Sequence, residues 1–427
     1  MKEMNGERRT RSKSYLIYLI IVLMFCEILD TYTTNYPNVI PSKVIAEFLS
    51  GFPQNVAESI FAISVAFASF GMYFVFFNQL LADRFGRKIL LSTTMLGMGL
   101  CSLLLIFSTG IIQYTIYLFL LYLFFSSDIW VIYINEESPP DKRGRLTNLV
   151  LIGGVTGSIL LPIFRSIFIT ETSPVGAWRA MPIFSVILGI PLSIIIFFTL
   201  KETSKYEEYK IEEITIETNI LKNNLKTIFS SERRKEFVAL MLITFLVGFN
   251  YIFVSIGEQY INSSPNLTEG DINIIVLVMS LAVILGYLFT GIFADKVGRK
   301  PLFYIYSILF IISILTVILG SRLENLAIIP VAIGAALANV SYWGIGVAIR
   351  LVVVEVIPTD VRGTGSGLKS LVSAFGITFG LVLSSVITYF FSLEISFIVL
   401  SLLLVLNLPL IYKFLRETKG VELSEIK

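Results

Sequence analysis

Two carboxylates lie where they are costly, inside a long apolar run. Glu27 and Asp30 fall within residues 15–34, three positions apart, so a helix there would carry both on one face. An ionised side chain in hydrocarbon costs at least about 2.5–3.5 kcal/mol, and such residues normally face a cavity or a partner and carry function. The chain has no histidine. A proton that crosses it must therefore be carried by carboxylates, and burial can raise the pKa of a carboxyl group toward neutrality.

Other polar and charged residues also interrupt apolar runs. They are Asp128, Arg165, Asn250 and Arg350. Two interpretations remain open. These residues could line a solute cavity together with Glu27 and Asp30, or they could form static pairs, such as Asp30 with Arg165 and Asp128 with Arg350, that hold helices in place.

The composition places these residues in a bilayer. The 427 residues are 55% hydrophobic and 15% charged, and the mean hydropathy is +0.81, outside the range of soluble globular proteins. Apolar runs long enough to cross about 30 Å of hydrocarbon as helices occur twelve times. They lie near 15–34, 58–81, 89–108, 113–134, 147–169, 180–200, 236–258, 273–293, 301–320, 326–350, 368–390 and 394–414. The sequence predicts an all-α membrane protein and offers no case for nucleic-acid binding.

Lysine and arginine predict the orientation. They cluster before the first run, after the second, fourth and eighth, and before the seventh, while the alternate loops hold few. Because positive loops stay in the cytoplasm, we expect both termini and the 201–235 connection to face the cytoplasm, in a multi-pass protein of the cell (plasma) membrane.

Two motifs recur at nearly the same spacing. ADRFGRK at 82–88 returns as ADKVGRK at 294–300, 294 − 82 = 212 residues later. EESPPDKRG at 136–144 returns as EVIPTDVRG at 355–363, 355 − 136 = 219 residues later. This indicates a duplication of six helices, and six spans give parallel repeats. The predicted units are a six-helix bundle at 1–200, a linker at 201–235 and a second six-helix bundle at 236–427.

The repeated motifs predict a set of cytoplasmic contacts. Gly86 and Gly298 suit a tight turn that residues with a Cβ resist, and the acidic and basic residues can pair, binding one half to the other in one conformation and releasing it in another. The alternative is that they only anchor the helices at the membrane surface. The predicted gate residues are Asp83, Arg84, Gly86, Arg87, Lys88, Glu136, Arg143, Gly144, Gly291, Asp295, Gly298, Arg299, Lys300, Glu355, Arg362 and Gly363.

These motifs resemble those of the major facilitator superfamily over nearly the whole chain. The stretch 291–300 matches the family's G-x-L-A-D-R-x-G-R-K signature, while KETSKY at 201–206 and RETKGVELSEI at 416–426 resemble the sugar porter branch, with Lys201 and Arg416 in place of prolines. The glutamine-rich signature of sugar carriers is missing from the seventh run, LVGFNYIFVSIG. The resemblance implies the major facilitator fold, a solute site between the halves, and a proton-coupling acid in the first helix: Asp30 first, then Glu27, with Asp128 third.

Three classes of function remain open: a secondary transporter, a transporter-like sensor and a membrane enzyme. RGTGSGLKS at 362–370 lacks the adjacent Gly-Lys of a phosphate loop, so ATP-driven pumping and a nucleotide cofactor are not expected. We expect glycines at Gly153 and Gly157, and at Gly376 and Gly380, to let helices approach closely. No metal cluster or nucleophile–base set suggests an enzyme. The expectation is a monomeric transporter of a sugar, organic acid or related metabolite, coupled to protons; the alternatives are a facilitative uniporter and a transporter-like sensor.

Overall fold

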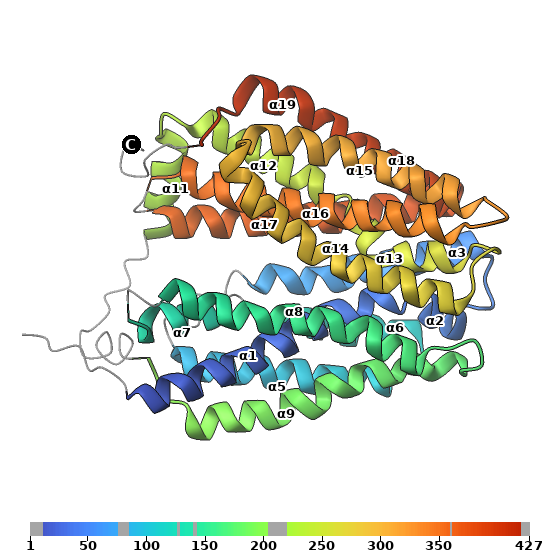
Figure 1. The fold of residues 1–427 in the computed structure, drawn as a ribbon, viewed down its shortest axis with the longest axis horizontal. Helices are drawn as coiled ribbons and strands as arrows, with labels where there is room; N and C mark the ends of the chain where they lie inside the picture. The colour runs from blue at the N-terminus through green and yellow to red at the C-terminus, as the bar shows by residue number, and fades with distance from the viewer. Residues whose placement is uncertain are drawn as a thin grey trace, which may run out of the picture.

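Long helices build the protein. The structure, a computed structural model, describes residues 12–75, 85–125, 129–139, 143–203, 220–358 and 361–419, and Figure 1 shows its helices running largely side by side. The elements are α1 (Lys13–Asn35), η1 (Tyr36–Val39), α2 (Pro41–Phe48), α3 (Gln54–Ser69), η2 (Phe70–Phe74), α5 (Arg87–Ile106), α6 (Ile111–Leu123), α7 (Ile129–Glu137), α8 (Arg143–Phe168), η3 (Val175–Ala180), α9 (Met181–Thr199), α11 (Ile220–Ser230), α12 (Arg234–Gly248), α13 (Tyr251–Asn262), α14 (Glu269–Lys296), α15 (Arg299–Ser321), α16 (Ile328–Val356), α17 (Arg362–Phe390), α18 (Leu393–Leu402), η5 (Leu403–Leu406) and α19 (Asn407–Phe414).

The apolar runs form the predicted membrane-spanning helices. Among the described residues, eleven helical stretches of 20–29 residues are long and apolar enough to cross a membrane. The predicted span 113–134 is instead divided between α6 and α7. Its acidic residue, Asp128, lies outside the described residues, as do Asp83 and Arg84. Large apolar side chains such as Ile112, Phe198 and Leu319 are exposed, as a surface that faces lipid requires.

Glycines bring helices into direct backbone contact. A Cβ at Gly157 of α8 would lie 2.6 Å from the carbonyl oxygen of Ile28 in α1. A Cβ at Gly376 of α17 would lie 2.3 Å from the carbonyl oxygen of Phe245 in α12. Both distances are too short for any side chain, so the predicted close approach at these glycine pairs is confirmed.

The helices form two groups (Figure 1). The N-terminal half contains α1 to α9, and the C-terminal half contains α12 to α19, with α11 beside it in the connection. We call the end where α1 begins and α19 finishes the termini end, and the opposite end, where α2 and α13 meet, the far end. The boundaries at residues 200 and 236 stay a prediction.

Candidate functional site

The carboxylates of α1 are half-buried, well along the helix. Asp30 lies 30 − 13 = 17 residues after the start of α1, which is about 25 Å at about 1.5 Å per residue. One turn earlier, Glu27 faces α8: a Cβ at Gly154 would be 3.0 Å from Glu27 Oε1. The two acids are therefore partly withdrawn from water in the N-terminal half.

Arg165 of α8 lies at the far end, and its side chain is fully buried. Its Nε donates to the carbonyl oxygen of Val39 at 2.8 Å, and its Nη2 donates to Glu258 Oε1 at 2.5 Å. Its Nη1 donates to Asn273 Oδ1, and Glu269 Oε2 lies 3.6 Å from Nη2. The partners Glu258, Asn273 and Glu269 belong to the C-terminal half. Arg165 therefore joins the two halves, in place of the static pair with Asp30 that the sequence left open.

A second cation completes this group. Lys43 of α2 pairs with Glu269, while Glu258 also accepts from the backbone N–H of Ser42 at 2.9 Å and from its Oγ–H at 2.6 Å. We call Lys43, Arg165, Glu258 and Glu269 the far-end cluster. Its two cations balance its two carboxylates, and multiple charge-assisted hydrogen bonds offset the cost of burying them.

A capping box fixes the start of α14, the helix that carries two partners of Arg165. Thr268 Oγ1 accepts from the N–H of Asp271 at 3.2 Å, while Asp271 Oδ2 accepts from the N–H of Thr268 at 2.9 Å. This reciprocal capping box satisfies N–H groups that the first turn would otherwise leave open. Glu269 and Asn273 consequently lie in the first two turns of α14, next to Arg165.

Further polar contacts join α3 of the N-terminal half to α17 and α13 of the C-terminal half; we call this line of contact between the halves the seam. Ser59 Oγ donates to the carbonyl oxygen of Ser385 at 2.8 Å, and Ser385 Oγ donates back to that of Ser59 at 2.9 Å. Nearer the far end, Glu58 Oε1 accepts from Gln259 Nε2 at 3.1 Å. The halves are thus joined at the far end over the first two turns of α3.

The repeated motifs lie at the termini end, where they form matching clusters. In the N-terminal half, Arg87 Nη2 donates to Glu136 Oε1 at 3.3 Å. Glu202 Oε1 accepts from the backbone N–H groups of Arg87 at 3.0 Å and of Lys88 at 3.2 Å. The N–H groups at a helix start attract a carboxylate, so Glu202 stabilises the beginning of α5.

The C-terminal half repeats this arrangement. Arg299 Nη2 donates to Glu355 Oε1 at 2.9 Å, and its Nη1 lies 3.1 Å from Asp295 Oδ1. Glu417 accepts from the backbone N–H groups of Arg299 at 2.8 Å and of Lys300 at 3.0 Å. Partial burial alone would raise the pKa of the Glu417 carboxyl, but these N–H groups outweigh it and the pKa lies below its ordinary value.

The glycine of each repeat adopts the backbone shape that the turn needs. Gly86 and Gly298 have φ of 99° and 108°, a region that side chains with a Cβ avoid. A Cβ at Gly298 would also lie 2.5 Å from Glu417 Oε2. Gly298 therefore leaves room for Glu417 at the start of α15, and Gly86 gives the start of α5 the same backbone shape.

The ion pairs Arg87–Glu136 and Arg299–Glu355 each lie within one half. In this conformation they join segments of the same bundle, and pairing between the halves through these motifs stays a prediction. The sequence motifs did not identify Glu202 and Glu417 as members of the two clusters at the termini end. Their spacing, 417 − 202 = 215 residues, was the available signal, because it repeats the offset of the other motifs.

The remaining candidates are scattered. Arg350 is exposed on α16, Gly291 is exposed on α14 and Gly363 is exposed on α17. Arg143 and Gly144 begin α8, and Arg362 begins α17, where its Nε donates to the carbonyl oxygen of Ile357 at 3.4 Å. Across the described ranges, groups of three or more His, Cys, Asp or Glu side chains that could hold a metal ion were not found.

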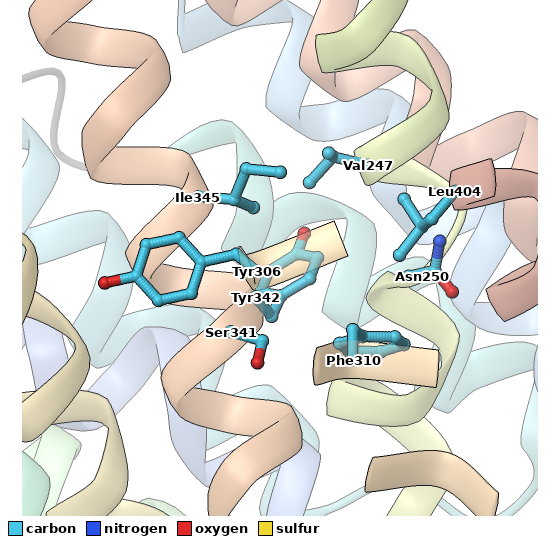
Figure 2. A pocket seen from close by; sticks show the side chains of 8 residues that line it. All are labelled: Val247, Asn250, Tyr306, Phe310, Ser341, Tyr342, Ile345 and Leu404. Carbon is cyan, nitrogen blue, oxygen red and sulfur yellow. The ribbon is translucent and has the colours of Figure 1, made fainter. Parts of the chain in front are cut away.

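Asn250 lies where the seventh span breaks. The helix stops at Gly248 and restarts at Tyr251, and the side chain of Asn250 donates to the carbonyl oxygen of Leu246 at 3.3 Å. Figure 2 shows Asn250 beside a cavity of about 10 Å³ that is lined from α12, α15, α16 and η5. That volume is at the lower limit for one water molecule, so a solute does not fit this cavity in the present conformation.

Comparison with known proteins gives a consistent result. A sequence model of the Major Facilitator Superfamily matches residues 20–257 and 238–426. The chain is 24% identical over 353 residues to a protein named as a niacin/nicotinamide transporter of Bacillus subtilis, covering 82% of this chain and 84% of that protein. The inward-open xylose transporter XylE of E. coli aligns with a TM-score of 0.71 at 18% identity, over 96% of this chain and 99% of that one. A D-xylose–proton symporter aligns with a TM-score of 0.72 at 16% identity, over 95% and 99%.

Proposed function

The chain belongs to the Major Facilitator Superfamily and is a multi-pass membrane transporter; we propose that it moves a small organic solute together with protons by alternating access. The observation that carries this proposal is the pair of half-buried carboxylates, Glu27 and Asp30, in a fold whose two halves are joined at the far end by ion pairs. A carboxylate so placed can take up a proton from one side and release it on the other as the halves rock.

The orientation follows from the distribution of basic residues. Lys13, Lys88, Arg145, Arg233 and Lys300 lie at or near the helix ends of the termini end. By the positive-inside rule this end faces the cytoplasm and the far end faces outward, in the plasma membrane. The far-end cluster then closes the outward side, and the conformation is one in which the solute path is shut to the exterior.

Asp30 is the proposed proton carrier, with Glu27 next and Asp128 third. Protonation neutralises Asp30, lowers the cost of withdrawing it from water and permits the movement that a charge would oppose. Histidine cannot take this role because the chain has none.

The solute class stays broad. A sugar, an organic acid or a related metabolite fits the proposal. Two of the similar proteins are named for niacin/nicotinamide and for xylose, and these solutes are small polar molecules of that size. Asn250, at the break of the seventh span, offers a polar contact near the middle of the bilayer. The proposed working unit is the monomer.

The deciding experiment is accumulation in proteoliposomes. Purified protein is tested first for thermal stabilisation by a panel of such solutes, and the hits are then tested for uptake with and without an imposed pH gradient. Symport predicts concentrative uptake that collapses when a protonophore is added. Uptake that equilibrates but ignores the pH gradient and the membrane potential would instead make the protein a uniporter.

A further inference from the structure

A groove opens at the termini end of the C-terminal half, between α11, α12 and α19. Figure 1 shows these three helices close together at that end. The groove has a volume of about 270 Å³, and its apolar walls are Phe229 of α11, Val238, Ala239 and Leu242 of α12, and Leu410 and Phe414 of α19. These contacts lie far from the far-end cluster and from the carboxylates of α1, so the groove has no part in the proposed proton pathway.

Basic side chains line one end of the groove, and apolar side chains line the rest of it. Arg234 and Lys235 line its end in the first turn of α12 and are exposed. Val238 and Leu242 follow Arg234 at intervals of four residues, on the same helical face, and are 42% and 48% exposed. The groove therefore presents positive charge at the membrane surface and an apolar wall toward the bilayer interior.

The surroundings reinforce the positive charge. Lys222 and Lys226 of α11 and Lys413 of α19 are exposed nearby. Arg416 is already paired, with its Nε 3.2 Å from Glu236 Oε1. Two acids here are exposed, Glu232 and Glu417, and Glu417 already accepts from the backbone N–H groups that begin α15. The exposed cations therefore outnumber the exposed acids.

We infer that this groove binds an anionic phospholipid of the cytoplasmic leaflet. The apolar wall accommodates an acyl chain, while Arg234 and Lys235 hold the phosphate. Exposed apolar surface at membrane depth is covered by lipid in any case, and the basic pair selects the headgroup. The inference rests on the proposed orientation of the transporter but not on its solute or on proton coupling.

Native mass spectrometry of the full-length protein tests the proposal. The protein is released from nanodiscs that contain phosphatidylcholine and phosphatidylglycerol in equal amounts. A basic residue at a membrane surface contributes about fivefold to the binding of an anionic lipid, so the wild type should retain phosphatidylglycerol over phosphatidylcholine by about 25-fold at low salt. The preference should weaken at high salt, which screens these charges.

The double variant Arg234→Gln, Lys235→Gln should lose the preference. The matched control Lys13→Gln, Arg145→Gln removes two exposed charges at the same end of the N-terminal half and should keep it. Leu242→Trp fills the groove and should release lipid of both kinds. Equal preference in the two double variants would overturn the proposal. So would a wild type that retains both lipids equally, or one that appears as a lipid-free dimer. None of these readouts requires transport.

Discussion

Arg165 and Glu258 meet across the two halves of the protein with Nη2 2.5 Å from Oε1, and their side chains are 0% and 1% exposed. Such a pair behaves differently from an ion pair at a surface. Removing Arg165 leaves the Glu258 charge buried with only the hydrogen bonds from Ser42, which costs up to roughly 3–5 kcal/mol. The cost falls on the conformation in which the far end is closed, because separating the halves would let water reach the remaining charge.

We therefore expect Arg165→Gln to shift the protein toward a far-end-open conformation. The measurement is labelling of Ser385→Cys, a seam position buried in this structure, by a membrane-impermeant thiol reagent. The background has Cys26 and Cys101 replaced by serine. The labelling rate should rise by at least about tenfold, since each 1.4 kcal/mol changes a population ratio about tenfold.

The control for this experiment is an ion pair within a single half. Arg322 Nη2 lies 2.5 Å from Glu394 Oε1, and the arginine is 62% exposed. Arg322→Gln should leave the labelling of Ser385→Cys unchanged. If Arg165→Gln labels no faster than Arg322→Gln, the far-end cluster is not the element that closes this side.

The helices and glycine contacts were predictable from sequence for a simple reason. A span of about 20 apolar residues has few alternatives to a membrane helix, and small residues four apart mark a close helix approach. The offset of the repeated motifs likewise predicted two similar halves. Each of these properties is local or periodic along the chain.

The partner of Arg165 was not predictable in this way. Sequence shows that Arg165 and Asp30 both lie in apolar spans, but it does not show which helix faces which. Glu258 ends the apolar run 236–258, so its position in the sequence is equally that of a residue at the membrane boundary. The break at Asn250 was also hidden, since the apolar pattern continues through it. Contacts between helices distant in sequence needed the fold.

A second prediction concerns the motif clusters of the termini end. Asp295 is 77% exposed and Glu355 is 14% exposed, although both contact Arg299. Because an exposed pair contributes only about 0–1 kcal/mol, Asp295→Asn should lower the unfolding temperature less than Glu355→Gln does. If Asp295 stabilises the state closed to the cytoplasm, Asp295→Asn should still raise the inward-open population and keep solute affinity. Unchanged cysteine accessibility from both sides would leave Asp295 as a membrane-surface anchor.

A third prediction tests the contact between α12 and α17. Gly376→Ala would place a methyl group 2.3 Å from the carbonyl oxygen of Phe245 and should cost about 1–3 kcal/mol by overpacking. Gly346 is also inside a helix, but a Cβ there meets nothing within 4 Å. Gly346→Ala should therefore be neutral or stabilise by up to about 1 kcal/mol. Thermal unfolding in detergent distinguishes the two, and equal unfolding temperatures would contradict the close approach.

A fourth prediction is a pH dependence that originates at Glu417. Its pKa is lower in the folded protein than its ordinary value of 4.5, so its stabilising contribution is complete above that value. The contribution is lost as the pH falls from about 4.5 through the lower folded pKa. Glu417→Gln should lower the free energy of unfolding by about 0.3–1 kcal/mol at neutral pH. In this variant the free energy of unfolding should also decrease less as the pH falls below about 4.5. Glu324→Gln, at an exposed carboxylate between α15 and α16, is the control. Its free energy of unfolding should decrease with falling pH as in the wild type.

The last prediction concerns coupling through Asp30. Asp30→Asn has nearly the shape of the protonated acid but cannot release a proton, so the conformational cycle should continue while its link to the pH gradient is lost. In proteoliposomes with an imposed pH gradient, the ratio of internal to external solute should fall to about one, while counterflow exchange should stay within about twofold of the wild type. Glu27→Gln, one turn away on the same helical face, separates the two carboxylates. If Asp30→Asn still concentrates solute and Glu27→Gln does not, Glu27 is the proton carrier. If both variants concentrate solute, coupling lies elsewhere, with Asp128 as the next residue to test.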